Sequence, residues 1–413
     1  MIQEILDKIK THQTEVERFF QKYESTLKPP IFLGCDIRNS NDKIAVVDTN
    51  IFPAGFNNLC NSFTKTTVAH FKNYLTQYFP HKKRVALLIE EHTRNRFYLE
   101  NVVRLSSIIS QAGFEVRVTY PGISLNENSI ELPILGQTLN LYQLQRNAEK
   151  IYAGDFVPEL IISNNDFSNG IPPVLEKSPI PIIPSPELGW WKRKKSRHFE
   201  ILNNIAEEFS AILNIDPRKI TTAFTVHTNA DLNDPNNLEA LRKKVDAILL
   251  QTQKYYDAAK INQSPYAFIK NDAGTYGMGV INVSSGEEIF QINRRARNKL
   301  RSSKGGSGVQ AFLIQEGIPT VDTYSDYPIE PVIYMVGFKP VGGFFRINSE
   351  RNSYSSLNTR GMSFSCLCLH KLDEPHEAQF LRCHEKQSVV EMAFVLARLA
   401  SIAVAIEGSS YSA

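Results

Sequence analysis

The part of the sequence that most constrains the fold is an apolar segment, an amphipathic segment and a second apolar segment within residues 84–120. The string RVALLIEEHTRNRFYLENVVRLSSIISQAGFEVRVTY predicts strands over 84–89 and 115–120, joined by a helix over 96–112 whose apolar residues recur at helical spacing. Units of this kind pair their strands in parallel, and both faces of such sheets are covered. The sequence therefore predicts an N-terminal α/β domain built on a parallel sheet.

Candidate ligand-binding side chains lie where predicted strands end. IFLGCD and KIAVVD each end in an aspartate, Asp36 or Asp48, and the buried strand over 159–166 ends in Asn164 and Asn165. Ligands of parallel sheets sit beyond the carboxyl ends of the strands, so we expect these side chains to face a ligand. Each has an ordinary alternative, because aspartate and asparagine at strand ends often cap helices or form turns.

Six prolines between 172 and 186 mark a change in organisation. So dense a run cannot continue a helix or a central strand, which places a domain boundary within 170–195. We expect an N-terminal domain over 1–195 and a second, α+β domain over 196–413. The second domain is predicted to contain helices near 197–213 and 235–260, a final apolar helix, and strands at ITTAFTVH, AFIKN, GVINV, VQAFLIQE, EPVIYMVG and GGFFRIN.

The charge balance argues against a protein that binds nucleic acid through its overall charge. The 413 residues include 46 basic and 43 acidic ones, a net charge of +3. The basic string KRKKSR after two tryptophans is interpreted as a solvated linker or as the basic rim of an anion-binding cleft, in preference to a nucleic-acid site.

Other global features point to a cytoplasmic protein without a membrane partner. No unbroken apolar run approaches the roughly 18 residues that a membrane span needs, and the amphipathic start lacks the apolar core of a signal peptide. Five scattered cysteines form no disulfide framework, which fits a reducing compartment. The alternating FSCLCLH suits a strand better than a zinc knuckle.

A lysine-bearing strand followed by a glycine-rich loop and another strand indicates phosphate binding. Lys270 lies in AFIKN and precedes NDAGTYGMG, in which Gly274, Gly277 and Gly279 would let backbone N–H groups approach an anion. The loop opens a strand, whereas Walker and dinucleotide-binding loops open a helix. The alternative is a hairpin whose glycines serve turn geometry alone.

Residues downstream complete an ordered set that resembles the ATP-grasp enzymes, in particular glutathione-synthetase-like ligases. The set consists of FLIQ running into Glu316, followed by IEPVIYMVGFKPVGGFFRINSERNSYSSLNTRG. The resemblance implies bound ATP and Mg²⁺. It places Gln315 and Glu316 at a hinge that contacts adenine, Glu330 at an acidic position, Arg346 on an arginine-bearing strand, and Asn358 with Gly361 in a loop.

Longer strings narrow the resemblance to one family. DIRNSNDKIAVVDTNIFPAGFNNL, EEHTRN, NNDFSNG, PSPELGW, FIKNDAGTYGMGV and LNTRGMSF are similar to the proteobacterial glutamate–cysteine ligases and spread over nearly the whole chain. The resemblance implies the first step of glutathione biosynthesis, in which the γ-carboxylate of L-glutamate is phosphorylated by ATP and then joined to the amine of L-cysteine. These small molecules are the expected partners, and a homo-oligomer is left open.

Phosphoryl transfer to a carboxylate calls for cations over the phosphates and a metal held by oxygen ligands. Lys270, Arg346 and Arg360 are the candidate catalytic cations, and Glu330 and Asn348 are the candidate metal ligands. Glutathione-synthetase-like ligases usually carry a Glu-x-Asn strand after the last helix, but here only EGSSYSA follows it. Either Asn348 in FFRIN takes that role or the ligands come from elsewhere.

The glutamate substrate needs partners for its α-carboxylate and α-ammonium groups. Arg38 or Arg94 is expected to clamp the carboxylate, and Asp36 or Asp48 to meet the ammonium group. Each arginine has a surface ion pair as its ordinary alternative. The neutral candidate partners are Asn39, Asn164, Asn165 and Asn358.

Two rival functions remain at this point. One is another ATP-grasp carboxylate–amine ligase, such as a glutathione synthetase or a peptide ligase. The other is a non-catalytic protein that binds a nucleotide or polyanion. Binding alone would need Lys270 and the glycines but not Glu330, Asn348 and Arg360 together, so the full set favours an enzyme.

Overall fold

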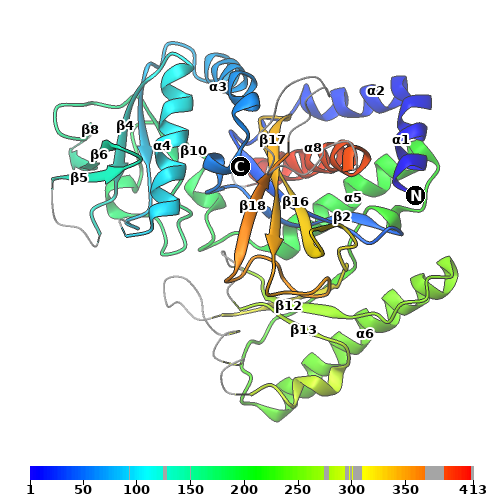
Figure 1. Ribbon diagram of the computed structural model, residues 1–413. Helices are drawn as coiled ribbons and strands as arrows, with labels where there is room; N and C mark the ends of the chain where they lie inside the picture. The colour runs from blue at the N-terminus through cyan, green and yellow to red at the C-terminus, as the bar shows by residue number, and fades with distance from the viewer. Residues whose placement is uncertain are drawn as a thin grey trace.

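The computed structural model describes residues 1–413 except 93, 124–127, 149, 274–278, 294–296, 298, 299, 301–308, 368–385 and 411–413. Three sheets organise the chain (Figure 1). Sheet B, formed by strands within residues 84–183, lies at the left of the view. Sheet A, formed by strands within 33–50 and 323–366, lies at the centre, and sheet E, formed by strands within 224–316, lies below it. A fourth, small sheet pairs only β7 (Gln145–Asn147) with β8 (Lys150–Tyr152).

Sheet B contains the predicted parallel strands. Its order is β10-β9-β3-β4-β6-β5, and the first five of these strands run parallel. The predicted helix is α4, which Asn95 caps by accepting a hydrogen bond from the Tyr98 N–H at 3.2 Å. The strand–helix–strand prediction and the α/β fold class are therefore confirmed. The elements are α3 (Thr64–Tyr78), β3 (Arg84–Leu88), α4 (Arg96–Gln111), β4 (Glu115–Tyr120), β5 (Ser129–Ile134), β6 (Gln137–Gln143), β9 (Leu160–Ser163) and β10 (Ile182–Ile183).

Sheet A joins the two halves of the sequence. It pairs strands in the order β18-β17-β16-β1-β2, all antiparallel, with β15 beside β16. The expectation that Asp36 and Asp48 end strands of the N-terminal domain is wrong, because both strands continue past the aspartates and β1 pairs with β16. The strands are β1 (Leu33–Asn39), β2 (Ile44–Asn50), β15 (Thr323–Tyr324), β16 (Tyr327–Val336), β17 (Lys339–Asn348) and β18 (Met362–Cys366).

A group of four helices lies at one face of sheet A, with α8 against the strands and the other three packed on α8 or on one another (Figure 1). They are α1 (Ile2–Thr11), α2 (Gln13–Glu24), α5 (Lys195–Leu213) and α8 (Gln387–Ser409). The amphipathic start of the sequence forms two helices that meet at His12. Helix α8 packs against β1, β2 and β16. In the part of the chain that the structure describes, it alone is long and apolar enough to cross a membrane, but 72% of its most apolar stretch is buried, as in the core helix of a globular domain.

Sheet E has a hydrophobic core of its own beneath α6. Its order is β11-β14-β12-β13, all antiparallel. Lys270 lies on β12, and Gln315 and Glu316 end β14, as the sequence predicts. The other two cores contain residues of both sheet A and sheet B, so these sheets share their packing across the predicted boundary near 195. The elements are β11 (Phe224–His227), α6 (Pro235–Ala259), β12 (Ala267–Asn271), β13 (Ile281–Val283) and β14 (Phe312–Glu316).

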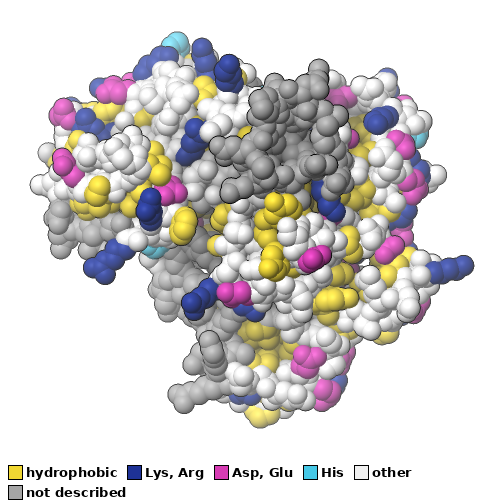
Figure 2. Space-filling model, viewed as in Figure 1, with side chains coloured by type: hydrophobic (Ala, Val, Ile, Leu, Met, Phe, Trp, Pro, Cys, Tyr) yellow, Lys and Arg dark blue, Asp and Glu magenta, His cyan; other side chains and the backbone are white. Residues whose placement is uncertain are grey.

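The surface does not separate into charge blocks on the face that Figure 2 shows, where basic and acidic side chains are interspersed among the described residues.

The interpretation of KRKKSR as a solvated linker is wrong for two of its members. The Arg193 side chain is fully buried and Lys195 is 7% exposed. Lys195 instead matches the alternative interpretation, a basic group at the rim of a cleft.

A buried asparagine connects sheet A to sheet B. The loop that follows β2 passes over α4, where Asn101 Oδ1 accepts a hydrogen bond from the Phe56 N–H at 2.9 Å. Asn101 Nδ2 donates to Asn164 Oδ1 at 3.1 Å, and Asn164 Nδ2 donates to the Pro53 carbonyl at 2.9 Å. Asn101 and Asn164 are 0% and 2% exposed. A polar group that lost its hydrogen-bond partner here would therefore stay unpaired, without access to water.

We predict that Asn101→Leu lowers the free energy of unfolding by about 2–4 kcal/mol, because it leaves the Phe56 N–H and Asn164 Oδ1 without partners. The matched control is Glu100→Gln on the same helix, whose exposed contact with Arg96 contributes less than about 1 kcal/mol. Urea unfolding followed by circular dichroism measures both. Equal midpoints for the two variants would show that this connection contributes nothing.

Candidate active site

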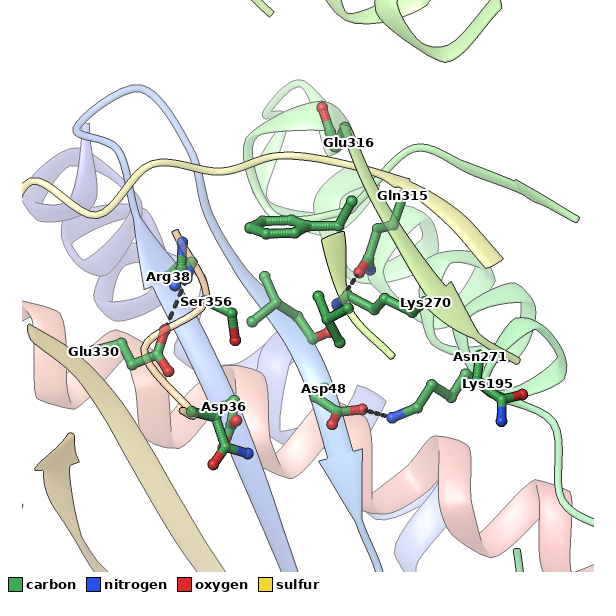
Figure 3. Close-up of a pocket in the computed structure, with 14 residues that line it drawn as sticks. Asp36, Arg38, Asp48, Lys195, Lys270, Asn271, Gln315, Glu316, Glu330 and Ser356 are labelled. Carbon is green, nitrogen blue, oxygen red and sulfur yellow. Dashed lines mark hydrogen bonds and ion pairs between the residues drawn. The ribbon is translucent and has the colours of Figure 1, made fainter. Parts of the chain in front are cut away.

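A pocket lies between sheet A and sheet E (Figure 3). Its empty space is about 670 Å³, including the part open to solvent. Residues of both sheets, of the start of α5 and of the loop between β17 and β18 line it. They are Asp36, Arg38, Val47, Asp48, Lys195, Phe268, Lys270, Asn271, Val280, Gln315, Glu316, Glu330, Ser356 and Asn358.

Two arginines and two carboxylates form a chain of ion pairs in sheet A. The Arg346 guanidinium lies 2.7 Å from Asp36 Oδ2 and 2.5 Å from Glu330 Oε1. Arg38 Nε lies 2.7 Å from the other oxygen of Glu330. Arg38 also donates to the Ser355 carbonyl at 2.6 Å, so its guanidinium is occupied within the protein although it lines the pocket. Two positive and two negative charges thus compensate one another in a nearly dry environment.

The two carboxylates of this chain differ in their ionisation. Burial raises the pKa of Asp36, against the effect of Arg346. Burial also disfavours the charged form of Glu330, but Arg38 and Arg346 outweigh it and lower the Glu330 pKa. Glu330 is therefore a fixed negative charge whose two oxygens both accept from arginines.

A second set of charges surrounds Asp48 on β2. Lys195 forms an ion pair with Asp48 Oδ1. Lys270 Nζ donates to the Val47 carbonyl at 3.1 Å and to Gln315 Oε1 at 2.7 Å. Figure 3 shows both lysines reaching toward the space between the sheets. Two ammonium groups therefore share one nearby carboxylate, which leaves this end of the pocket suited to an anion.

Burial and charge set the ionisation of these groups. Burial would raise the pKa of Asp48, but the charges of Lys195 and Lys270 outweigh it and lower the pKa. Burial lowers the pKa of Lys270 to about 8, with Asp48 opposing the shift and Lys195 adding to it. Lys270 therefore loses its charge at a pH more than two units below that of a lysine in water.

The start of the glycine-rich loop is anchored on the first turn of α5. The Asp272 carboxylate accepts from the Ser196 N–H and hydroxyl, both at 2.8 Å, and the Asp272 carbonyl accepts from the Lys195 N–H at 2.8 Å. Gly274 and Gly277 lie outside the described residues. Gly279 has φ +67°, a left-handed conformation that favours glycine, and it precedes the pocket residue Val280.

The predicted hinge residues line the pocket but have partners in the protein. Gln315 accepts from Lys270, and Glu316 forms a buried ion pair with Lys43. Glu316 Oε1 also accepts from the Ala223 N–H at 2.8 Å. The assignment of this strand end to adenine binding stays a prediction.

The predicted substrate residues divide into two groups. Asp36, Arg38, Asp48 and Asn358 line the pocket, and Asn358 makes no side-chain hydrogen bond to another described residue. The others are not among the lining residues. Asn39 donates to Asp322 at 3.0 Å, Asn164 holds the connection to sheet B, Asn165 accepts from the Phe167 N–H at 2.9 Å, and Arg94 is exposed in the loop after β3.

The predicted metal ligands are also engaged by the protein. Asn348 is fully buried, and its amide donates to the carbonyls of Leu357 at 3.1 Å and Arg360 at 3.2 Å. Its role in the structure is to shape the loop that carries Asn358. The Arg360 side chain is exposed and does not line the pocket. Among the residues described, no three His, Cys, Asp or Glu side chains cluster as a metal site, and the predicted FSCLCLH strand is described only as far as Leu367.

Sequence reasoning missed several pocket residues. Lys195, Asn271, Phe268 and Ser356 line the pocket but were not proposed as site residues. The signal for Lys195 was present in the basic string at the start of α5, but its pairing with Asp48 joins residues 147 positions apart. Asn271 directly follows Lys270 at the end of β12, so its place next to a predicted site residue is the signal that could have identified it.

Comparisons with known proteins agree with these features. A family model described as GshA, glutamate-cysteine ligase, matches residues 7–408. The chain is similar to a solved structure from Methylobacillus flagellatus KT, provisionally named a gamma-glutamylcysteine synthetase, with 31% identity, a TM-score of 0.86, and coverage of 98% of this chain and 95% of that one. A search of curated proteins found no match.

Two further solved structures share 12% identity with this chain. They are a D-alanyl-alanine synthetase A from Vibrio cholerae, with a TM-score of 0.36 and coverage of 77% and 81% of the two chains, and a glutathione synthetase-like effector from Globodera pallida, with a TM-score of 0.37 and coverage of 84% and 75%. These likenesses are too low to support an argument.

The family model and the Methylobacillus structure each span nearly the whole chain. The protein therefore belongs to the GshA family of glutamate–cysteine ligases and joins L-glutamate to L-cysteine in an ATP-dependent reaction.

Proposed function

We propose that the pocket between sheet A and sheet E is where this ligation takes place, through γ-glutamyl phosphate. The observation that carries the proposal is the pair of ammonium groups of Lys195 and Lys270: Lys195 forms an ion pair with Asp48, and both charges lower the pKa of that carboxyl group. Phosphates are the most highly charged part of the reacting molecules, and two cations in a partly buried site favour them strongly.

The two lysines bind the phosphates and hold the transferring group in line with the γ-carboxylate of glutamate. A γ-carboxylate oxygen attacks the γ-phosphorus of ATP, and ADP leaves. The amine of cysteine then attacks the acyl carbon, phosphate departs with the original carboxylate oxygen, and the amine loses a proton. Positioning and charge neutralisation supply most of the acceleration of the first step.

A divalent metal fits the donor set of the pocket. Mg²⁺ takes oxygen ligands and is usually bound by one or two carboxylates together with substrate phosphates. Asp48 would hold it, because its side chain is 36% exposed and its pKa is lowered, with Asn358 as a neutral oxygen donor. When bound, the ion neutralises phosphate charge. We do not assign it to Glu330 or Asn348, whose polar atoms bind within the protein.

The chain of ion pairs in sheet A sets the charge of the pocket wall. Arg346 neutralises Asp36 and Glu330, so that these carboxylates do not repel the phosphates and the glutamate γ-carboxylate. Asp36 lies at the pocket wall; each of its oxygens accepts one hydrogen bond from Arg346 and keeps a further lone pair for the ammonium group of an amino acid substrate. Arg346 is thus assigned to charge balance in the wall, since it is not among the lining residues.

We predict that Lys195→Met and Lys270→Met each lower kcat/KM for γ-glutamylcysteine formation by about 100-fold, because each removes a charge that faces the phosphates. The matched control is Lys192→Met, a nearby surface lysine paired with Glu187 outside the pocket. Product is quantified by mass spectrometry with glutamate, cysteine, ATP and Mg²⁺. Parental activity in either pocket variant would rule out this pocket as the site.

The pKa of Lys270 predicts how nucleotide affinity depends on pH. Above pH 8 the free enzyme loses the Lys270 charge, so we expect the Kd of a non-hydrolysable ATP analogue to rise about tenfold between pH 8 and 9.5. Lys270→Arg keeps its charge throughout this range, and its Kd should stay flat. Calorimetric titration at each pH measures both. A rise of the same size in Lys270→Arg would assign the effect to another group.

The route through γ-glutamyl phosphate makes a separate isotopic prediction. Glutamate labelled with ¹⁸O in its γ-carboxylate should transfer one labelled oxygen to inorganic phosphate for each peptide formed, as the phosphorylated oxygen leaves with phosphorus. Mass spectrometry of the phosphate and nucleotide products detects it. Label in AMP would instead indicate attack on the α-phosphorus.

A further inference from the structure

A buried polar cluster lies behind the Asp48–Lys195 pair and contributes no residue to the pocket lining. Arg193 Nε donates to Glu407 Oε1 at 2.8 Å, and its Nη2 donates to Glu407 Oε2 at 3.1 Å. His198 Nδ1 lies 3.4 Å from Glu407 Oε2. Arg193, Glu407, His198 and Thr49 are each at most 2% exposed. Glu407 belongs to the last part of α8, and Arg193 and His198 flank the start of α5.

The cluster contacts both elements that carry the ion pair. On β2, Thr49 follows Asp48 directly; its carbonyl accepts from Arg193 Nη1 at 2.9 Å, and its hydroxyl lies 3.0 Å from His198 Nε2. Around the start of α5, Arg193 stands two residues before Lys195, ahead of the helix, and His198 stands three residues after it, in the first turn. Glu407 therefore holds Arg193, which binds the backbone of β2 beside Asp48, and lies beside His198 in the first turn of α5, which carries Lys195.

We propose that Arg193, His198, Thr49 and Glu407 form a positioning unit that sets the separation of Asp48 and Lys195 for the ligation reaction. This inference rests on the proposed role of the pocket. The last turns of α8, far from the pocket in sequence, then contribute to turnover. None of the four residues touches substrate, so each acts through Asp48 or Lys195.

The chemistry of the cluster favours a positioning role over a purely stabilising one. A buried ion pair gives little or no net stability compared with apolar side chains of similar volume. Its directional hydrogen bonds do, however, fix the relative placement of the groups that they join. One nitrogen of the Arg193 guanidinium donates to the Thr49 carbonyl and the other two donate to Glu407. These three hydrogen bonds fix the orientation of the guanidinium. Turnover is sensitive to displacements of about 1 Å at a reacting group.

The decisive variant is the double substitution Arg193→Met with Glu407→Leu, which removes both charges and keeps an apolar core. We expect its unfolding midpoint to return near that of the parent, while each single substitution lowers it. We expect kcat of the double variant to stay about tenfold or more below the parent, with KM for glutamate and cysteine changed less than about twofold. Parental kcat in the double variant would overturn the proposal.

A milder pair of variants keeps the test valid if the double variant does not fold. Thr49→Val removes the hydroxyl that faces His198 without adding bulk, whereas Thr49→Ser keeps the hydroxyl. We expect a reduced kcat with unchanged KM in Thr49→Val, and a kcat near that of the parent in Thr49→Ser. Equal kcat in Thr49→Val and the parent would overturn the proposal.

The two proposals fail in distinguishable ways. If Lys195→Met is as active as the parent, the assignment of the pocket fails, whatever the cluster variants do. If Lys195→Met is impaired while the folded double variant and Thr49→Val turn over like the parent, the pocket stands and only the positioning role is refuted.

Discussion

The structure depends on the Arg346 guanidinium, which lies between Asp36 and Glu330 in the middle of sheet A. Without this cation Asp36 would lose its ion-pair partner in a buried site and Glu330 would keep only Arg38, at a cost of several kcal/mol. Arg346 stands on β17, Asp36 on β1 and Glu330 on β16, so one side chain ties together three strands from opposite ends of the sequence. The placement of acidic groups on the pocket wall follows from this charge balance.

The pocket has a division of charge that follows from its two walls. Sheet A supplies carboxylates that arginines already compensate, and sheet E with the start of α5 supplies lysines that share Asp48. We propose that a substrate that brings phosphates meets the two lysines on one side, and that an amino acid that brings an ammonium group meets Asp36 on the other. A ligase that joins glutamate to cysteine at the expense of ATP needs both kinds of surface within one cavity.

Local patterns predicted the elements well, and long-range pairing explains what they missed. The strand–helix–strand unit over 84–120, Lys270 on its strand and the strand ending in Gln315 and Glu316 are each encoded by consecutive residues, and the structure contains them. The pairing of β1 with β16 joins residues about 300 positions apart, and no local periodicity indicates it. Asp36 was therefore placed at a strand end beside the parallel sheet, although it lies within an antiparallel one.

The site residues show the same limit more sharply. Asn164 and Asn348 carry amide groups that could bind a substrate or a metal ion, but these amides form hydrogen bonds within the protein. Lys195 belongs to a basic string whose members differ in burial, since Lys192 is on the surface and Arg193 is in the core. Composition cannot separate such neighbours, because burial is decided by elements that are distant in sequence.

The most direct test of the central claim is a crystal structure with a non-hydrolysable ATP analogue, Mg²⁺ and L-glutamate. The terminal phosphates are predicted to lie between Lys195 and Lys270 beside Asp48, with the glutamate γ-carboxylate next to them in the same pocket. Phosphates bound instead at the carboxyl edge of the parallel sheet, near Arg94 and away from these lysines, would contradict it.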